Sequence, residues 1–299
     1  MVLRIGTDCS GIEAPIQALR KLQIPHEHVF SSEIDKYTVE SIKANYSPCC
    51  MYGDISYRDN NLLSYIDLYV CSFPYQPFFI NRPSLDIRNK KCNIFWKCID
   101  VIKVKNPKFF ILESIKGILS NDDGRTWKII LTALHSLEKY GYVVKYRVLN
   151  TRNFGIPQNR ERVYIVGYKS DTGIEFQWPS EKKMEDIKNY VDWENTIQEN
   201  TISKSVQDRF PKESVFINPR FTQTAFSNTH MYCPSITSGS GQIWCVPLGR
   251  YASPRELLWL QGFPKDFKQV VSNTQLTRQI GNSMSVNVLC SLLENLISI

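Results

Sequence analysis

The sequence predicts an α/β protein with a parallel, doubly wound sheet and a second, smaller domain. Short apolar runs alternate with amphipathic segments through residues 1–170, as in chains that join parallel strands by helices. Residues 171–250 are instead polar and irregular. Helical patterning returns afterwards, and 284–296 is apolar enough to pack back onto the sheet. We therefore expect a first domain of residues 1–170, completed by 272–299, and a small domain of residues 171–271.

The elements follow from the spacing of apolar residues, which repeats every second position or forms a short run in strands and repeats every three to four positions in helices. Strands are predicted at 3–7, 29–32, 68–72, 109–112, 142–149 and 162–168, with a further short strand just before Gly53. Helices are predicted at 12–22, 37–45, 94–102, 127–134, 254–260 and 284–296.

The composition is that of a soluble globular protein, with 42% hydrophobic and 22% charged residues. No run of 18 apolar residues predicts a membrane span, and the first residues lack the organisation of a signal peptide. Nine cysteines, an odd number, are scattered without a CxxC pair, which argues against a disulfide framework and a zinc site. We expect an intracellular protein in a reducing compartment, without a metal.

The net charge of +7 permits a polyanionic partner without requiring one. Part of this charge recurs in the polar segment, at Lys182, Lys183, Lys188, Lys204, Arg209, Lys212 and Arg220. These residues could line a nucleic-acid surface of the small domain, or they could form the solvated face of a long insertion. Charge alone does not separate the two interpretations.

Three predicted strands end in residues suited to a nucleotide, at the sheet edge where ligands bind in open α/β folds. Gly11 follows the first strand and opens a helix, Glu33 follows the second, and Asp54 follows the third. A carboxylate at Glu33 could accept hydrogen bonds from ribose hydroxyls, and one at Asp54 from an adenine amino group. Each acid alone is more often a helix cap. Together they indicate an adenosine-type cofactor, and the absence of GxxxxGK[ST] argues against a nucleoside triphosphate.

Further motifs carry a resemblance to a known family. They are Pro74-Tyr75-Gln76, Glu113-Ser114-Ile115, the QxRxR element from Gln158 to Arg162, Leu260-Gln261-Gly262-Phe263-Pro264, and Gln279-Ile280-Gly281-Asn282-Ser283. With the strand-end motifs they span residues 3–290, and their order resembles that of cytosine-C5 DNA methyltransferases of the type II modification kind. The last three motifs are the most specific.

The resemblance implies a Rossmann-like domain that binds S-adenosylmethionine (SAM) and a small target-recognition domain. The cofactor residues would be Cys9, Ser10, Gly11, Ile12, Glu33, Ile34, Asp54, Ile55, Phe73, Asn282 and Ser283. Double-stranded DNA would contact Gln76, Gln158 and Arg160, and residues 171–250 would read its sequence. The target cytosine would be flipped out of the duplex. Glu113 would hold its ring nitrogen and amino group, while Arg160 and Arg162 would support the flipped base and its loop. We expect a monomer.

Tyr75 departs from this pattern, because the family has a cysteine between the proline and the glutamine. In that chemistry a thiolate adds to carbon 6 of cytosine, which makes carbon 5 electron-rich enough to take a methyl group. A thiol with a pKa of about 8.5 ionises readily near neutral pH, whereas a phenol has a pKa of about 10. Cys71, four residues earlier, is expected to lie buried in a strand. We therefore predict that methyl transfer is impaired or lost.

Two smaller departures lie nearby. The first-strand loop has Glu13-Ala14 where the family has glycines, and Ser114 replaces an asparagine that braces the active-site loop. Several functions stay open: a methyltransferase homologue with impaired catalysis, an active modification methyltransferase, a non-catalytic module that binds SAM and DNA, and an RNA methyltransferase on the same scaffold. An NAD-dependent enzyme would leave the motifs at 158–162 and 279–282 unexplained.

Overall fold

A mixed seven-stranded sheet forms the centre of the protein in a computed structural model that describes residues 2–74, 94–195, 202–220, 230–239 and 243–297. The strand order is β3 (Cys50–Tyr52), β2 (His26–Ser32), β1 (Leu3–Asp8), β4 (Leu68–Ser72), β5 (Phe109–Ile115), β8 (Glu161–Lys169) and β6 (Tyr142–Asn150). The first five strands are mutually parallel, but β8 is antiparallel to both β5 and β6. The prediction of a fully parallel sheet is therefore wrong at this edge.

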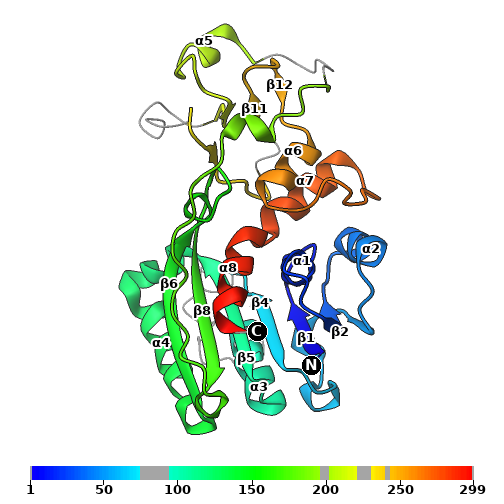
Figure 1. Cartoon of the computed structure of the whole chain (residues 1–299), viewed down its shortest axis with the longest axis vertical. Coiled ribbons are helices and arrows are strands. Elements are labelled where there is room, and N and C mark those ends of the chain that lie inside the picture. Colours follow the sequence, from blue (N-terminus) through cyan, green and yellow to red (C-terminus); the bar gives the residue numbers. More distant parts are fainter. Residues whose placement is uncertain (1, 75–93, 196–201, 221–229, 240–242, 298–299) are drawn as a thin grey trace.

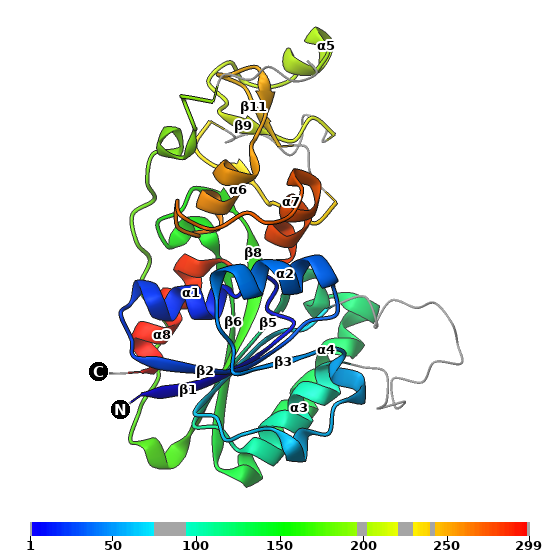
Figure 2. The ribbon, with the colours of Figure 1, turned by 90° about the vertical axis from the view of Figure 1, so that its right-hand side faces the viewer.

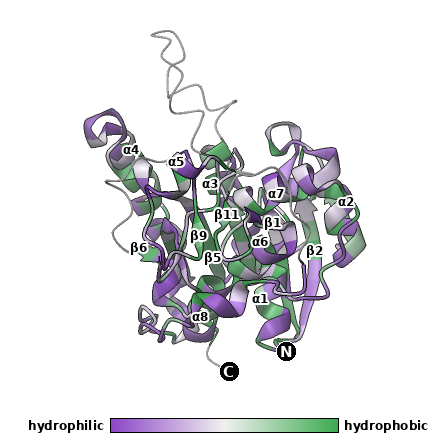
Figure 3. Ribbon diagram, turned by 90° about the horizontal axis from the view of Figure 1, so that it is seen from above, coloured by the Kyte–Doolittle hydropathy of each residue, from purple (hydrophilic) through white to green (hydrophobic). Residues whose placement is uncertain are grey.

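Helices cover both faces of the sheet, as predicted for a doubly wound fold. Figure 2 shows α1 (Ala14–Lys21), α2 (Lys36–Asn45) and α8 (Val286–Leu296) on one side, with α3 (Ile94–Lys105) and α4 (Arg125–His135) on the other. Side chains alternate along β4 accordingly. Leu68 and Val70 belong to the core with α1 and α8, whereas Tyr69 and Cys71 belong to the core with α3 and α4. In Figure 3 the ribbon around β5, in the middle of the sheet, is coloured as hydrophobic.

A smaller region lies above the sheet in Figure 1. It contains the antiparallel strands β9 (Phe216–Ile217), β11 (Trp244–Cys245) and β12 (Arg250–Tyr251), and a parallel pair formed by β7 (Gln158–Asn159) and β10 (Cys233–Pro234). Its described helices are α5 (Lys204–Gln207), α6 (Pro254–Leu260) and α7 (Asn273–Asn282). The segment after β8 still contacts the sheet region, because Lys182 pairs with Glu294 of α8 at 3.0 Å. The division into two domains stays a prediction.

Short 3-10 helices connect the larger elements. They are η1 (Ile55–Tyr57), η2 (Asn60–Leu62), η4 (Lys116–Leu119), η5 (Asn121–Gly124), η6 (Glu138–Tyr140), η7 (Thr151–Asn153), η8 (Ser170–Thr172) and η9 (Ile187–Tyr190). The predicted strands and helices are all confirmed within a few residues, and α5 and α7 are additional helices. Among the helices that the structure describes, none is both long and apolar enough to cross a membrane.

Candidate active site

The predicted functional residues gather at the carboxyl ends of β1, β2, β4 and β5. The strand order reverses between β1 and its neighbour β4, because β2 and β3 follow on one side and β5 on the other. Such a switch point opens a crevice at the carboxyl edge of a sheet, and ligands of α/β proteins bind there. The fold therefore puts the candidate nucleotide residues on one side of this crevice and Glu113 on the other.

The loop after β1 packs tightly against the end of α7. Cys9 and Gly11 have positive φ angles of 51° and 63°. A Cβ atom on Gly11 would lie 3.2 Å from Cα of Ser283, in a backbone conformation that favours glycine. This close approach brings the loop next to Asn282 and Ser283, as the predicted cofactor site requires.

Glu13 stabilises this loop through hydrogen bonds from three hydroxyl groups. Its side chain is 1% exposed, and Oε1 accepts hydrogen bonds from the hydroxyls of Thr7 at 2.8 Å, Ser31 at 2.6 Å and Ser10 at 3.3 Å. Burial raises the pKa of Glu13 to about 7, although the three hydroxyls act in the opposite direction. A residue that departs from the family's glycine pattern thus joins β1, its loop and β2.

Glu33 and Asp54 follow β2 and β3 but have different local roles. Glu33 Oε1 accepts the backbone N–H groups of Ile34 at 2.8 Å and Asp35 at 3.0 Å, and burial raises the pKa of Glu33. The neighbouring Ile34 side chain is 76% exposed, although it is apolar. Asp54 caps η1 by accepting from the backbone N–H of Ser56 at 2.7 Å. Within the part of the chain that the structure describes, each acid keeps one carboxylate oxygen without a partner.

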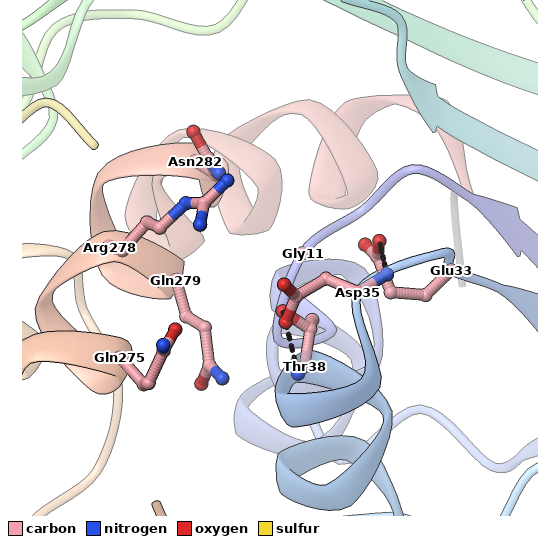
Figure 4. Close-up of a pocket in the computed structure, with 8 residues that line it drawn as sticks. All are labelled: Gly11, Glu33, Asp35, Thr38, Gln275, Arg278, Gln279 and Asn282. Carbon is pink, nitrogen blue, oxygen red and sulfur yellow. Dashed lines mark hydrogen bonds between the residues drawn. The ribbon is translucent and has the colours of Figure 1, made fainter. Parts of the chain in front are cut away.

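A pocket between α2 and α7 brings several of these residues together (Figure 4). It contains about 330 Å³ of space that is partly open to solvent. Its lining residues are Gly11, Glu33, Asp35, Thr38, Gln275, Arg278, Gln279 and Asn282. In Figure 4 Glu33 and Asp35 lie on one wall, and Arg278 and Asn282 on the other. Three residues predicted from the sequence, Gly11, Glu33 and Asn282, therefore line one pocket.

Other predicted cofactor residues are buried in the supporting structure. Ile12, Ile55, Phe73 and Ser283 are at most 3% exposed. The Phe73 ring packs against Phe95 with 5.3 Å between ring centroids. Its backbone N–H donates to the Glu113 carbonyl at 3.1 Å, and its own carbonyl accepts from Ser114 Oγ at 3.2 Å. Phe73 therefore fixes the end of β4 rather than presenting its side chain to the crevice.

Glu113 lies at the end of β5 and is 3% exposed. Its Oε2 accepts from the Ser72 hydroxyl at 2.6 Å, across the register that pairs these residues of β4 and β5. Its Oε1 lies 3.4 Å from Nε of Arg162 and has no hydrogen-bond partner among the described residues. One oxygen is thus fixed while the other can still accept a hydrogen bond.

The chain leaves β4 toward position 75 beside Glu113. The Ser114 hydroxyl bonds the Phe73 carbonyl, so this segment keeps a brace although the family's asparagine is absent. Tyr75 and Gln76 lie outside the described residues. Cys71 is buried as predicted, and its Sγ lies 3.3 Å from Sγ of Cys98. Burial raises the pKa of Cys71 well above its ordinary value, which disfavours the thiolate.

Two residues that the motifs assigned to DNA have structural roles instead. The Arg160 guanidinium is buried and donates to the carbonyls of Ile236, Gly281 and Ser283. Burial lowers the pKa of Arg160 to about 9, and the nearby charge of Arg162 acts in the same direction. The assignment of Arg160 to the flipped base and the DNA is therefore corrected, because both terminal nitrogens donate to backbone carbonyls and the side chain is buried.

Gln158 needs the same correction. It is fully buried, and its amide nitrogen donates to the Leu260 carbonyl at 2.8 Å and to Gln261 Oε1 at 2.6 Å. Its own oxygen accepts from the Ile236 N–H at 3.2 Å. The QxRxR element therefore joins the sheet to α6, α7 and the segment at 236, and only Arg162 reaches Glu113.

Sequence reasoning missed one prominent group, a salt bridge between Asp8 and Arg58. Asp8 is fully buried at the end of β1, and Arg58 lies between η1 and η2. Asp8 would have been a signal, since a carboxylate in a buried strand needs a partner. Across the described ranges no three His, Cys, Asp or Glu side chains are arranged to hold a metal ion.

Comparisons with known proteins match nearly the whole chain. The family model for C-5 cytosine-specific DNA methylases matches residues 8–298. The type II methyltransferase M.BsuFI of Bacillus subtilis is 35% identical over 86% of this chain, which spans 64% of that protein. M.NgoBI of Neisseria gonorrhoeae is 33% identical over 89% of this chain and 86% of its own length. The fold is similar to that of S. pombe Dnmt2 methyltransferase, with a TM-score of 0.74 and 20% identity over 99% of this chain and 98% of that one.

Proposed function

Because the chain belongs to the C-5 cytosine-specific DNA methylase family, we propose that it is a SAM-dependent DNA cytosine-5 methyltransferase homologue whose catalysis is impaired or lost. The observation that carries the proposal is the contrast between Glu113, which is placed with a free acceptor beside β4, and Tyr75, which stands where the chemistry needs a thiolate. The scaffold would bind both ligands without supplying the nucleophile.

The crevice residues fit an adenosine cofactor. Glu33 has a carboxylate oxygen available for ribose hydroxyls, and the exposed Ile34 offers an apolar surface to a base. Asp54 could accept an adenine amino group, and Gly11 leaves room where a side chain would press on α7. Ser283 is fully buried, so it would support this site through the close approach of its backbone to Gly11. When bound, SAM supplies the methyl group from its sulfonium.

Glu113 would recognise the flipped cytosine through its free oxygen. Oε1 can accept the cytosine amino group while Ser72 and Arg162 hold the carboxylate in position. A proton donated from Glu113 to the ring nitrogen would polarise the ring toward addition at carbon 6. The acid can therefore prepare the base even where no nucleophile follows.

Tyr75 would fail in the next step. A phenol is largely protonated at neutral pH and is a poor nucleophile toward an aromatic carbon. Cys71 is a weak substitute, because it is buried in β4. Removing a nucleophile from enzymes that use one lowers kcat by several orders of magnitude.

The smaller region above the sheet would bind double-stranded DNA, with residues 171–250 reading its sequence. The basic side chains predicted for this role include Lys188 and Lys212, which are exposed. Phosphate contacts of this kind make affinity fall with rising salt. An active modification methyltransferase, a module that binds SAM and DNA without turnover, and an RNA methyltransferase are the alternatives that the following experiment separates.

The test is transfer of a tritiated methyl group from SAM to unmethylated DNA and to RNA, comparing the chain with its Tyr75→Cys variant. Tyr140→Cys is the matched control. This partly exposed tyrosine lies just before the first residue of β6, away from the carboxyl ends of β4 and β5. We expect transfer to DNA by Tyr75→Cys only. If the unaltered chain transfers methyl to DNA as fast as Tyr75→Cys does, the predicted impairment is contradicted and an active enzyme is favoured. If neither transfers methyl, SAM binding distinguishes a binding module from a scaffold that has lost both functions.

A further inference from the structure

Arg58 forms a closed, buried salt bridge below the candidate cofactor crevice. Its two terminal nitrogens donate to the two carboxylate oxygens of Asp8, each at 2.8 Å. The side chains of Arg58 and Asp8 are 6% and 0% exposed. The Tyr69 hydroxyl donates to the same carboxylate at 2.8 Å. This bidentate geometry is the strongest form of an arginine–carboxylate contact, and it fixes both partners.

Arg58 also contacts the ends of the two neighbouring strands. Its NH1 group donates to the Ser32 hydroxyl at the end of β2. Its guanidinium lies over the rings of Phe30 in β2 and Tyr52 in β3, at 5.0 and 5.5 Å from their centroids. One side chain therefore contacts the last residue of each of the three strands β1, β2 and β3.

These three last residues immediately precede the segments proposed to hold the cofactor. Asp8 comes before the loop that contains Gly11, Ser32 comes before Glu33, and Tyr52 comes two residues before Asp54. Arg58 is itself the C-cap of η1, the helix that Asp54 caps at its other end. Movement of the guanidinium would thus shift Asp54 directly and the other two segments through their strands.

We propose that Arg58 is a positioning residue for the adenosine part of the cofactor, because it holds the ends of β1, β2 and β3 in one arrangement. The inference rests on the proposed SAM site. It adds that Arg58 fixes the spacing between the three strand ends that precede the cofactor residues. A planar guanidinium suits this position, since its fork binds both Asp8 oxygens while its face lies against two rings. A lysine would offer one charged point and no flat face.

The test is calorimetric binding of S-adenosylhomocysteine and S-inosylhomocysteine. These ligands differ only at the edge of the base that would meet Asp54, since the inosyl compound has an oxygen in place of the amino group and a hydrogen on the neighbouring ring nitrogen. The chain is compared with Arg58→Lys and with Asp8→Leu/Arg58→Met, which removes both buried charges and leaves none unpaired. Arg4→Met is the matched control, because Arg4 lies at the other end of β1 and pairs with Glu27 at the surface.

We expect both Arg58 variants to bind S-adenosylhomocysteine about tenfold or more weakly, equivalent to about 1.4 kcal/mol, and to lose most of their preference for it over the inosyl ligand. Arg4→Met should keep both properties. An equal loss for the two ligands, with the preference unchanged, would show a merely structural role and overturn the inference, as would unaltered binding by the double variant. If the unaltered chain binds neither ligand, the proposed SAM site fails, and this inference fails with it.

Discussion

Two buried acid–arginine pairs lie at carboxyl ends of strands in the same sheet, and they differ in how completely each acid is satisfied. Asp8 receives two hydrogen bonds from Arg58 and one from Tyr69, all at 2.8 Å. Glu113 receives one from Ser72 at 2.6 Å, while Arg162 stays 3.4 Å away from its second oxygen. Both oxygens of Asp8 are already hydrogen-bonded, whereas one oxygen of Glu113 can still accept a hydrogen bond from a ligand. This difference distinguishes Asp8, which supports the fold, from Glu113, the candidate catalytic acid.

The largest expected effect concerns Glu113. In the Tyr75→Cys background, Glu113→Gln should lower methyl transfer to DNA by about 10²- to 10⁴-fold, the range typical of general acid–base groups. Binding of S-adenosylhomocysteine should stay within about twofold, because Glu113 lies across the crevice from the proposed adenosine residues. Rate and ligand affinity are measured on the same preparations. A loss of affinity as large as the loss of rate would mean that Glu113 supports the crevice as a whole.

Substitution of Asp8, whose oxygens are both hydrogen-bonded, should instead have its main effect on the free energy of unfolding. Asp8→Asn leaves the buried Arg58 without its counter-charge, and breaking such a pair destabilises a protein by about 3–5 kcal/mol. Glu113→Gln should cost less than about 1 kcal/mol, since the amide keeps an oxygen for Ser72. Urea denaturation of both variants measures the difference. If both variants lose a similar amount of unfolding free energy, the Asp8–Arg58 and Glu113–Arg162 pairs do not differ in the way proposed.

A third buried carboxylate, Glu13, should make the stability of the protein depend on pH. Burial raises its pKa to about 7 from an ordinary value of 4.5, so the folded state favours the protonated form. Its contribution to stability is therefore fully present below pH 4.5 and is lost as the pH rises through 7. Glu13→Gln should be more stable than the unaltered chain at pH 8 by about 2–3 kcal/mol and closer to it at pH 5, because one pKa unit corresponds to about 1.4 kcal/mol.

His28 determines how this pH profile must be interpreted. It lies 3.9 Å from Glu13, and burial lowers its pKa to about 4. Its contribution to stability is present above pH 6.5 and is lost as the pH falls through 4, opposite to that of Glu13. The measurement therefore compares Glu13→Gln with the unaltered chain at each pH, so that the His28 contribution largely cancels. A stability difference that does not grow between pH 5 and 8 would contradict the raised pKa of Glu13.

Most elements could be predicted from the sequence, because strand and helix periodicities are local. The direction of β8 could not be inferred from alternation alone, although the lack of an α-helix between β6 and β8 was a usable signal. Antiparallel strands need no helical crossover, whereas parallel strands usually have one. Glu33 and Glu113 were found because they follow apolar runs at the edge where ligands bind.

The functions of polar residues within a motif were harder to predict. Arg160 and Arg162 are two positions apart and equally basic, yet one is 2% exposed and bonded to carbonyls while the other reaches Glu113. The Asp8–Arg58 pair joins residues 50 positions apart, and no local pattern connects them. Both cases depend on which side chain the tertiary fold buries, and a motif does not record that.

The smallest effect concerns the brace next to position 75. Ser114→Ala removes the hydrogen bond from Ser114 Oγ to the Phe73 carbonyl and should destabilise the chain by about 1 kcal/mol, the usual net value of one such bond. In the Tyr75→Cys background it should also slow methyl transfer more than it weakens cofactor binding, because Phe73 directly follows β4 and lies two residues before the nucleophile position. Ser136→Ala, which removes a hydroxyl bond at the far end of α4, is the matched control. If the two alanine variants transfer methyl equally fast, Ser114 only stabilises the fold.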